Sequence, residues 1–225
     1  MKDDGQGWQI YGDGTVLKAC AADKKFAYVV ALARAVNALK SAHALMMSTG
    51  NKQTPTAIRD RMNSHFFISG ILYESLKLIR NMSNVFSGDK SFETSLRPIL
   101  KDTSGRSLEQ MHLKSVRHGG VFHYAPDRFA DAIKKTGMTE CVFASSIGHK
   151  KGDIHYGFAD LITAEMTVGG RLDNSVVVKE MMEKTLNLVK QFIDQSEDFI
   201  ADQLKGWGFK ALPFLPGVSG NQSPG

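Results

Sequence analysis

The 225-residue sequence is poor in cysteine and has only six prolines. Its two cysteines, Cys20 and Cys141, lie far apart and outside any C-x-x-C pair. A secreted disulfide framework and a thiolate zinc site are therefore not expected. Residues 1–5 are polar and acidic, which is not typical of a signal peptide. A reducing cytoplasm is the expected compartment.

The chain also lacks an uninterrupted apolar run of membrane-spanning length. The most apolar stretch, from Phe26 to Met47, contains Arg34, Lys40 and His43. These side chains are too costly at the centre of a bilayer for an ordinary spanning helix. We therefore expect no membrane partner.

The sequence motifs of the common cofactor and metal sites are absent as well. There is no G-x-x-x-x-G-K-[ST] loop, no G-x-G-x-x-G after a strand, no H-E-x-x-H, no G-x-S-x-G and no EF-hand loop. The seven histidines are not spaced as metal pairs on one helix face. We expect no metal and no cofactor. His43 and His65 fall among apolar residues and are expected to be hydrogen-bonded core or boundary residues.

The composition that remains is that of a soluble globular domain, with 42% apolar and 23% charged residues. Residues 51–137 hold 14 basic and 8 acidic side chains, whereas residues 138–205 hold 7 basic and 11 acidic ones. The middle of the chain could therefore present a positive surface to phosphates. The alternative is an ordinary solvated surface.

Apolar periodicity predicts a mainly α fold, a bundle of five to six helices with a small β-hairpin insertion. Residues 1–22 are expected to form a flexible arm, residues 23–205 a single helical domain, and residues 206–225 an extended or disordered tail. Asp23 is expected to cap a helix over residues 24–48, and Thr54-Pro55 to start a second long helix.

Several shorter elements are expected between the long helices. A segment over residues 91–101 contains Pro98, and a helix beginning at residues 105–107 should place Leu108, Met111 and His112 on one side. A further helix should span residues 126–135. Residues 138–170 are expected to contain the hairpin and then a short helix. The last long helix should run from about residue 175 to residue 205.

The residues richest in chemistry lie at 114–124, KSVRHGGVFHY. Arg117 can grip a phosphate through two parallel hydrogen bonds, and a histidine can move a proton near neutral pH. On an ideal helix, Arg117 and His123 point about 120° apart. One copy of the chain would therefore not focus both groups tightly, whereas two copies across a two-fold axis could.

Arg117, the polar His118 and His123 resemble the R-x4–6-H motif of the HEPN superfamily (higher-eukaryote and prokaryote nucleotide-binding domains). Members are small helical bundles, often dimeric, and many are metal-independent endoribonucleases of toxin–antitoxin and phage-defence systems. Some HEPN toxins carry a tyrosine two residues after the histidine. Here Tyr124 is adjacent to His123, so that part of the pattern differs.

The resemblance implies a homodimeric endoribonuclease in which the RNA 2′-hydroxyl attacks the neighbouring phosphate. Catalytic roles would fall to Arg117, His118 and His123, and substrate binding to Lys114 and Tyr124. RNA and an antitoxin protein are the implied partners. The alternative is a non-catalytic helical module that binds a protein or a nucleotide, with His123 as a buried or capping residue and Arg117 as an ion-pair partner.

Overall fold

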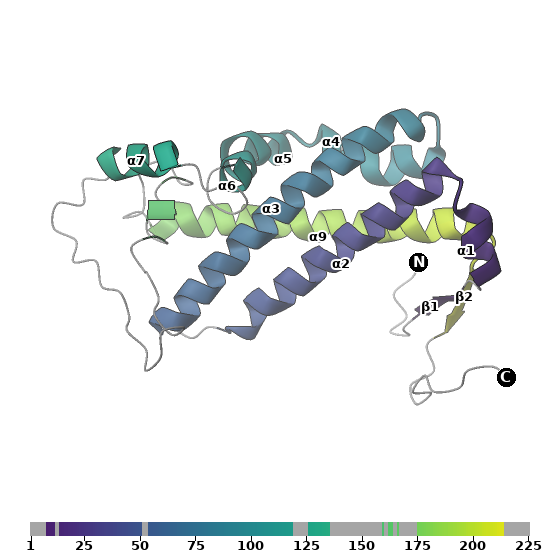
Figure 1. Ribbon diagram of the computed structural model, residues 1–225, viewed down its shortest axis with the longest axis horizontal. Helices are drawn as coiled ribbons and strands as arrows, with labels where there is room; N and C mark the ends of the chain where they lie inside the picture. The colour runs from purple at the N-terminus through teal and green to yellow at the C-terminus, as the bar shows by residue number, and fades with distance from the viewer. Residues whose placement is uncertain are drawn as a thin grey trace.

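The computed structural model confirms the mainly α class: long helices pack around a main apolar core, and a short β-ladder joins the two ends of the described chain (Figure 1). The structure describes residues 8–11, 14–50, 54–118, 126–135, 159, 162–163, 166 and 175–213. Three long helices dominate the fold: α2 (Lys24–Ser48), α3 (Pro55–Val85) and α9 (Ser175–Gly206).

The two expected helix starts are confirmed by their caps. The Asp23 side chain accepts a hydrogen bond from the backbone N–H of Lys25, and the Thr54 hydroxyl accepts one from that of Ala57. Each cap satisfies a backbone donor that the first helical turn leaves unpaired. From these starts α2 and α3 run antiparallel and pack against each other (Figure 1).

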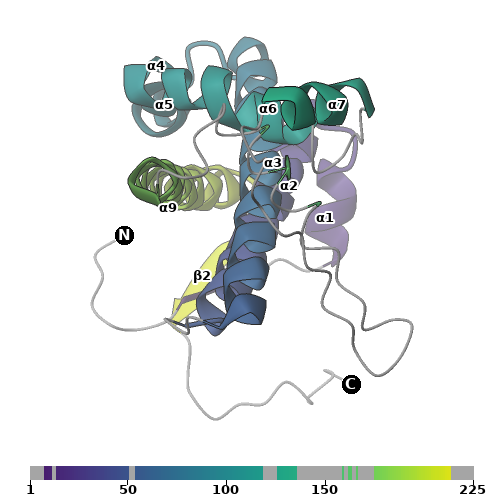
Figure 2. The ribbon, with the colours of Figure 1, turned by 90° about the vertical axis from the view of Figure 1, so that its left-hand side faces the viewer.

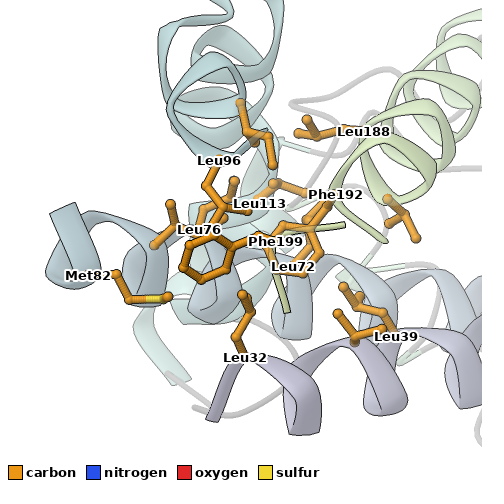
Figure 3. Close-up of a cluster of buried hydrophobic side chains, with 14 of the residues drawn as sticks. Leu32, Leu39, Leu72, Leu76, Met82, Leu96, Leu113, Leu188, Phe192 and Phe199 are labelled. Atoms are coloured by element: carbon orange, nitrogen blue, oxygen red, sulfur yellow. The ribbon is translucent and has the colours of Figure 1, made fainter. Parts of the chain in front are cut away.

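Helix α9 crosses both α2 and α3, so its apolar face completes the core (Figures 1 and 2). Phe192 and Phe199 of α9 are fully buried among leucines of the other helices (Figure 3). Because both rings are buried within one chain, they belong to its own core and are not available for a dimer interface.

Between α3 and α7 the chain returns along the bundle as a broken helix. Its parts are a π-helical turn η1 (Phe92–Leu96), α4 (Arg97–Lys101), α5 (Thr103–Leu108), a second π-helical turn η2 (Glu109–Leu113) and α6 (Lys114–Val116). Pro98 lies in the first turn of α4, where its missing N–H costs least. Asp102 then caps α5, because its side chain accepts from the N–H groups of Ser104 and Gly105.

The π-helical turn η2 changes which side chains face inward. The helical period predicts that Met111 shares one side of the helix with Leu108, His112 and Ser115. In the structure His112 and Leu108 are buried, but Met111 is 72% exposed, and Leu113 and Val116 are fully buried instead. A π turn takes more residues per turn than an α-helix, so it rotates the residues that follow relative to an ideal 3.6 period.

Helix α7 (Pro126–Lys135) has the expected bounds. Of the short helix expected within 158–168, the described residues Ala159, Ile162, Thr163 and Met166 are helical. The β-hairpin insertion is not supported: residues 141–156 lie outside the described residues, and the two described strands are elsewhere in the sequence.

The strands join the beginning and the end of the described chain. Strand β1 (Trp8–Tyr11) pairs antiparallel with β2 (Lys210–Pro213), and α1 (Gly14–Cys20) follows β1. The structure differs here from the flexible arm and extended tail that composition predicts, because each end supplies the backbone partners of the other. Non-local pairing of this kind leaves no periodic signal in so short a segment.

Trp207, which follows α9, contacts the beginning of α2. Its indole N–H donates to the Asp23 carboxylate at 3.0 Å, and its ring meets Phe26 edge-on at 5.0 Å. The end of α9 is thereby tied to the cap of α2. None of the helices in the described ranges is long and apolar enough to cross a membrane.

Candidate functional site

Arg117 and Glu74 form the central contact of the candidate site. Arg117 follows α6, and its Nε donates to Oε1 of Glu74 on α3 at 2.8 Å. The arginine side chain is 20% exposed and the glutamate side chain 44%. The guanidinium is therefore held against α3 at a partly buried position, and it does not extend into bulk solvent.

His118 lies beside this pair and is exposed. Its ring meets that of Tyr73 on α3 at 5.6 Å, with an interplanar angle of 79°. An edge-to-face contact of this kind favours one orientation of the imidazole. Tyr73 and Glu74 are neighbours on α3, so that one turn of this helix holds both Arg117 and His118.

A cleft of about 470 Å³ opens next to His118. It is lined by His118, Lys114, Arg128 of α7, Gln110 and Ser115. The structure thus brings together two of the expected site residues, Lys114 and His118, with a cation from α7. Among the described residues that line this cleft Arg117 does not appear, because it faces Glu74.

The other two expected site residues, His123 and Tyr124, lie outside the described residues, as do Gly119 and Gly120. The pairing of Arg117 with His123 is therefore still a prediction. Lys114 is one turn before Arg117 on the same helical run and is exposed, as substrate binding would require.

A second and larger cleft, of about 590 Å³, continues along the same side of the molecule. Its walls come from α3, α4, α5, η2, α6 and α9. The charged residues among those that line it are Arg80, Arg97, Lys101, Arg106, Glu109 and Lys114. Five of these six are basic, so the cleft attracts anions.

Three arginines of the larger cleft are held in place by other groups. Arg80 pairs with Glu109, whose side chain is only 13% exposed. Arg97 binds both carboxylate oxygens of Glu93, which lowers the pKa of Glu93. Arg106 donates its Nε to the carbonyl of Leu100 at 2.6 Å. Fixed guanidinium groups lose little further rotamer freedom when they bind an anion.

Helix α3 carries four basic residues that the sequence allows either as a solvated face or as the lining of an RNA-facing groove: Arg59, Arg61, Lys77 and Arg80. Of these only Arg80 lines the cleft, while Arg59 pairs with Asp60 and Arg61 donates to the Gly50 carbonyl. The cleft residues on α4 and α5 had no periodic signal, because the two helices are short and separated by Asp102.

Two buried histidines, His65 and His112, contact each other between α3 and η2. The Nε2 atoms of His65 on α3 and His112 on η2 are 3.0 Å apart, and the Ser69 hydroxyl is 3.5 Å from the latter. A hydrogen bond between two imidazole nitrogens needs one donor and one acceptor. Burial, and to a smaller extent the neighbouring His112, lowers the pKa of His65 to about 3. His65 is therefore neutral near pH 7, and its burial and its contact with His112 confirm that it is a hydrogen-bonded core residue.

This pair has too few ligands for a metal centre. Within the described ranges no group of three or more histidine, cysteine, aspartate or glutamate side chains is placed to hold a metal ion.

Comparison of the chain with protein-family models, with curated proteins and with solved structures finds no match.

Proposed function

We propose that the protein is a HEPN-like, metal-independent endoribonuclease of the toxin or phage-defence type. Arg117, His118 and His123 would form its catalytic site at a homodimer interface, and Lys114 and Tyr124 would bind RNA. One observation carries the proposal: the first part of the motif lies beside a cationic cleft, with Arg117 oriented by Glu74 and with Lys114 and His118 lining the cleft.

The proposed reaction needs only groups of the protein and the RNA. The 2′-oxygen of the RNA attacks the adjacent phosphorus as His123 takes its proton. The bond from phosphorus to the 5′-oxygen then breaks, and a histidine protonates the departing oxygen. Arg117 stabilises the charge that develops on the phosphoryl oxygens, and His118 positions the phosphate. The products are a 2′,3′-cyclic phosphate and a 5′-hydroxyl.

The proposal includes a homodimer, because two copies would bring two sets of Arg117 and His123 to one interface. It includes a cytoplasmic location, supported by the absence of any cysteine framework in the sequence. An antitoxin protein would be the natural inhibitor of such an activity.

The test is cleavage of a mixed RNA pool in EDTA by the wild type and by His123→Ala, with equal folding of the two checked by circular dichroism. The proposal predicts cleavage by the wild type and its loss in the variant. Equal cleavage by both would place the activity elsewhere or in a contaminant, and the motif would be abandoned.

One observation favours the second candidate, a non-catalytic helical module that binds a protein or a nucleotide. The Arg117–Glu74 ion pair is also what a purely structural arginine would make. That candidate predicts no cleavage by either protein, together with saturable binding of a nucleotide or a partner protein.

A further inference from the structure

We propose that the two clefts form one cationic track that binds single-stranded RNA on one side of the Arg117 site. The inference rests on the proposed function for the identity of the ligand. It adds Arg80, Lys101 and Arg106 as substrate-binding residues that the motif does not contain.

The two clefts are continuous. Gln110 and Lys114 line both of them. Tyr73 lines the larger cleft and contacts the ring of His118, which lines the smaller one. A ligand in the larger cleft can therefore extend along the surface into the smaller one and reach His118, which is next to Arg117 in the sequence.

The charge of the track exceeds what its own carboxylates neutralise. Arg80 and Arg97 each have a carboxylate partner, Glu109 and Glu93 respectively. Four further cations are exposed and form no salt bridge with a carboxylate of the described residues: Lys101, Arg106, Lys114 and Arg128. Of these, Lys101 still attracts Glu93, whose pKa it helps to lower, but Glu93 is already bound by Arg97. Cations spaced along a groove bind successive phosphates, because each phosphodiester carries one charge.

The floor of the larger cleft differs from its rim. Leu76, Ile99 and Leu188 reach it from the core and are buried, and Tyr73 is partly buried beside them. An apolar floor with an aromatic ring suits the face of a nucleobase, whereas the cations of the rim suit its phosphates. A duplex keeps its base faces stacked, so this combination favours a single strand.

The clefts of about 590 Å³ and 470 Å³ are each of the size that takes a small organic ligand. Joined at Lys114, they offer room for more than one nucleotide. A short strand whose phosphates follow the rim would therefore present one of its phosphodiesters near His118.

The experiment measures binding separately from cleavage. A fluorescent 2′-O-methyl oligouridylate of about twelve nucleotides lacks the attacking hydroxyl, so it reports binding even to an active nuclease. Its affinity for the full chain is measured by anisotropy at several salt concentrations. The test variant is Lys101→Gln/Arg106→Gln, and the control is Lys190→Gln/Lys205→Gln, which removes the same charge from the exposed face of α9. Thermal melts confirm that all three proteins fold.

The wild type and the control should bind with the same affinity and the same salt dependence. The test variant should bind at least about tenfold more weakly at 0.1 M salt, and the slope of log K against log salt should shrink by about 1.4. Absence of binding by the wild type, equal binding by the test variant, or equal losses in both variants would overturn the track.

Failure of the track and failure of the proposed nuclease give different results. Track-dependent binding without cleavage of unmodified RNA would reject the nuclease and keep the track. Cleavage that needs His123, with unchanged binding by Lys101→Gln/Arg106→Gln, would reject the track and keep the nuclease.

Discussion

The Nε of Arg117 lies 2.8 Å from Oε1 of Glu74, across the interface between the end of α6 and the middle of α3. These residues are 43 positions apart in the sequence. The contact fixes the orientation of the arginine of the R-x4–6-H motif before any ligand binds. Glu74 is therefore a positioning residue for the proposed reaction.

Glu74→Gln tests this role. Loss of the carboxylate should lower RNA cleavage about 10- to 100-fold, because an arginine displaced by about 1 Å no longer meets the phosphoryl oxygens. Stability should fall by no more than about 1 kcal/mol, since the pair is partly exposed. Rates of cleavage and urea melts are measured on the same preparations.

The matched control is Glu183→Gln, which removes an exposed carboxylate paired with Lys179 on α9. It should leave cleavage unchanged. A Glu74→Gln protein with wild-type cleavage would show that the ion pair is structural only.

The buried His65 should make stability depend on pH. The folded protein keeps its imidazole neutral because its pKa is lowered to about 3, whereas the unfolded chain binds a proton there below about pH 6.5. Above pH 6.5 the histidine is mostly neutral in both states, so it costs the folded state little. As the pH falls from 6.5 toward 3, the free energy of unfolding decreases by up to about 1.4 kcal/mol per pH unit. Between pH 7 and pH 5 the loss should be about 2 kcal/mol.

Urea melts of the wild type and of His65→Gln over this pH range check the effect. Glutamine does not titrate, so the variant should lose less stability on acidification, whatever its stability at pH 7. Parallel pH profiles for the two proteins would mean that His65 is charged in the folded state or does not control acid stability.

Asp23 should stabilise two elements at once. One carboxylate oxygen caps α2 through the N–H of Lys25, and the other accepts from the indole of Trp207. Asp23→Ala should cost about 1–3 kcal/mol, because both donors lose their partner. Asp23→Asn keeps one acceptor and should cost less. Equal losses in the two variants would show that only the negative charge matters.

Three fully buried phenylalanines that contact one another, Phe86, Phe92 and Phe199, should contribute strongly to stability. Phe199 packs edge-on against Phe86 and Phe92, at ring-centre distances of 5.2 and 5.9 Å. Phe199→Ala should cost about 3–5 kcal/mol in chemical melts, because the cavity cannot fully collapse. Val30→Ala, at a half-exposed position on α2, should change stability by less than about 0.5 kcal/mol.

The sequence predicted the long helices well because their signals are local. Asp23, Thr54 and Pro126 mark helix starts by chemistry that acts within one turn. On α3, residues spaced three or four apart form one buried face, as a 3.6-residue period requires: Phe66, Ser69, Leu72, Leu76 and Ile79. The exposure of Met111 departs from the 3.6-residue period because Met111 lies within the π-helical turn η2.

The candidate site was only partly predictable for a different reason. Lys114 and His118 come from one helical run, so their closeness to each other follows from the sequence. Glu74, Arg80 and the residues of α4 and α5 join them only through tertiary packing, which single-chain periodicity does not encode. The β1–β2 ladder is hidden for the same reason, since its strands lie at opposite ends of the described chain.

The most direct test of the central claim is the chemistry of the RNA ends after cleavage in EDTA. The account predicts fragments with 2′,3′-cyclic phosphates and 5′-hydroxyls from the wild type, and none from His123→Ala or Arg117→Ala. Fragments with 3′-hydroxyl and 5′-phosphate ends, or the same fragments from the two variants, would contradict it.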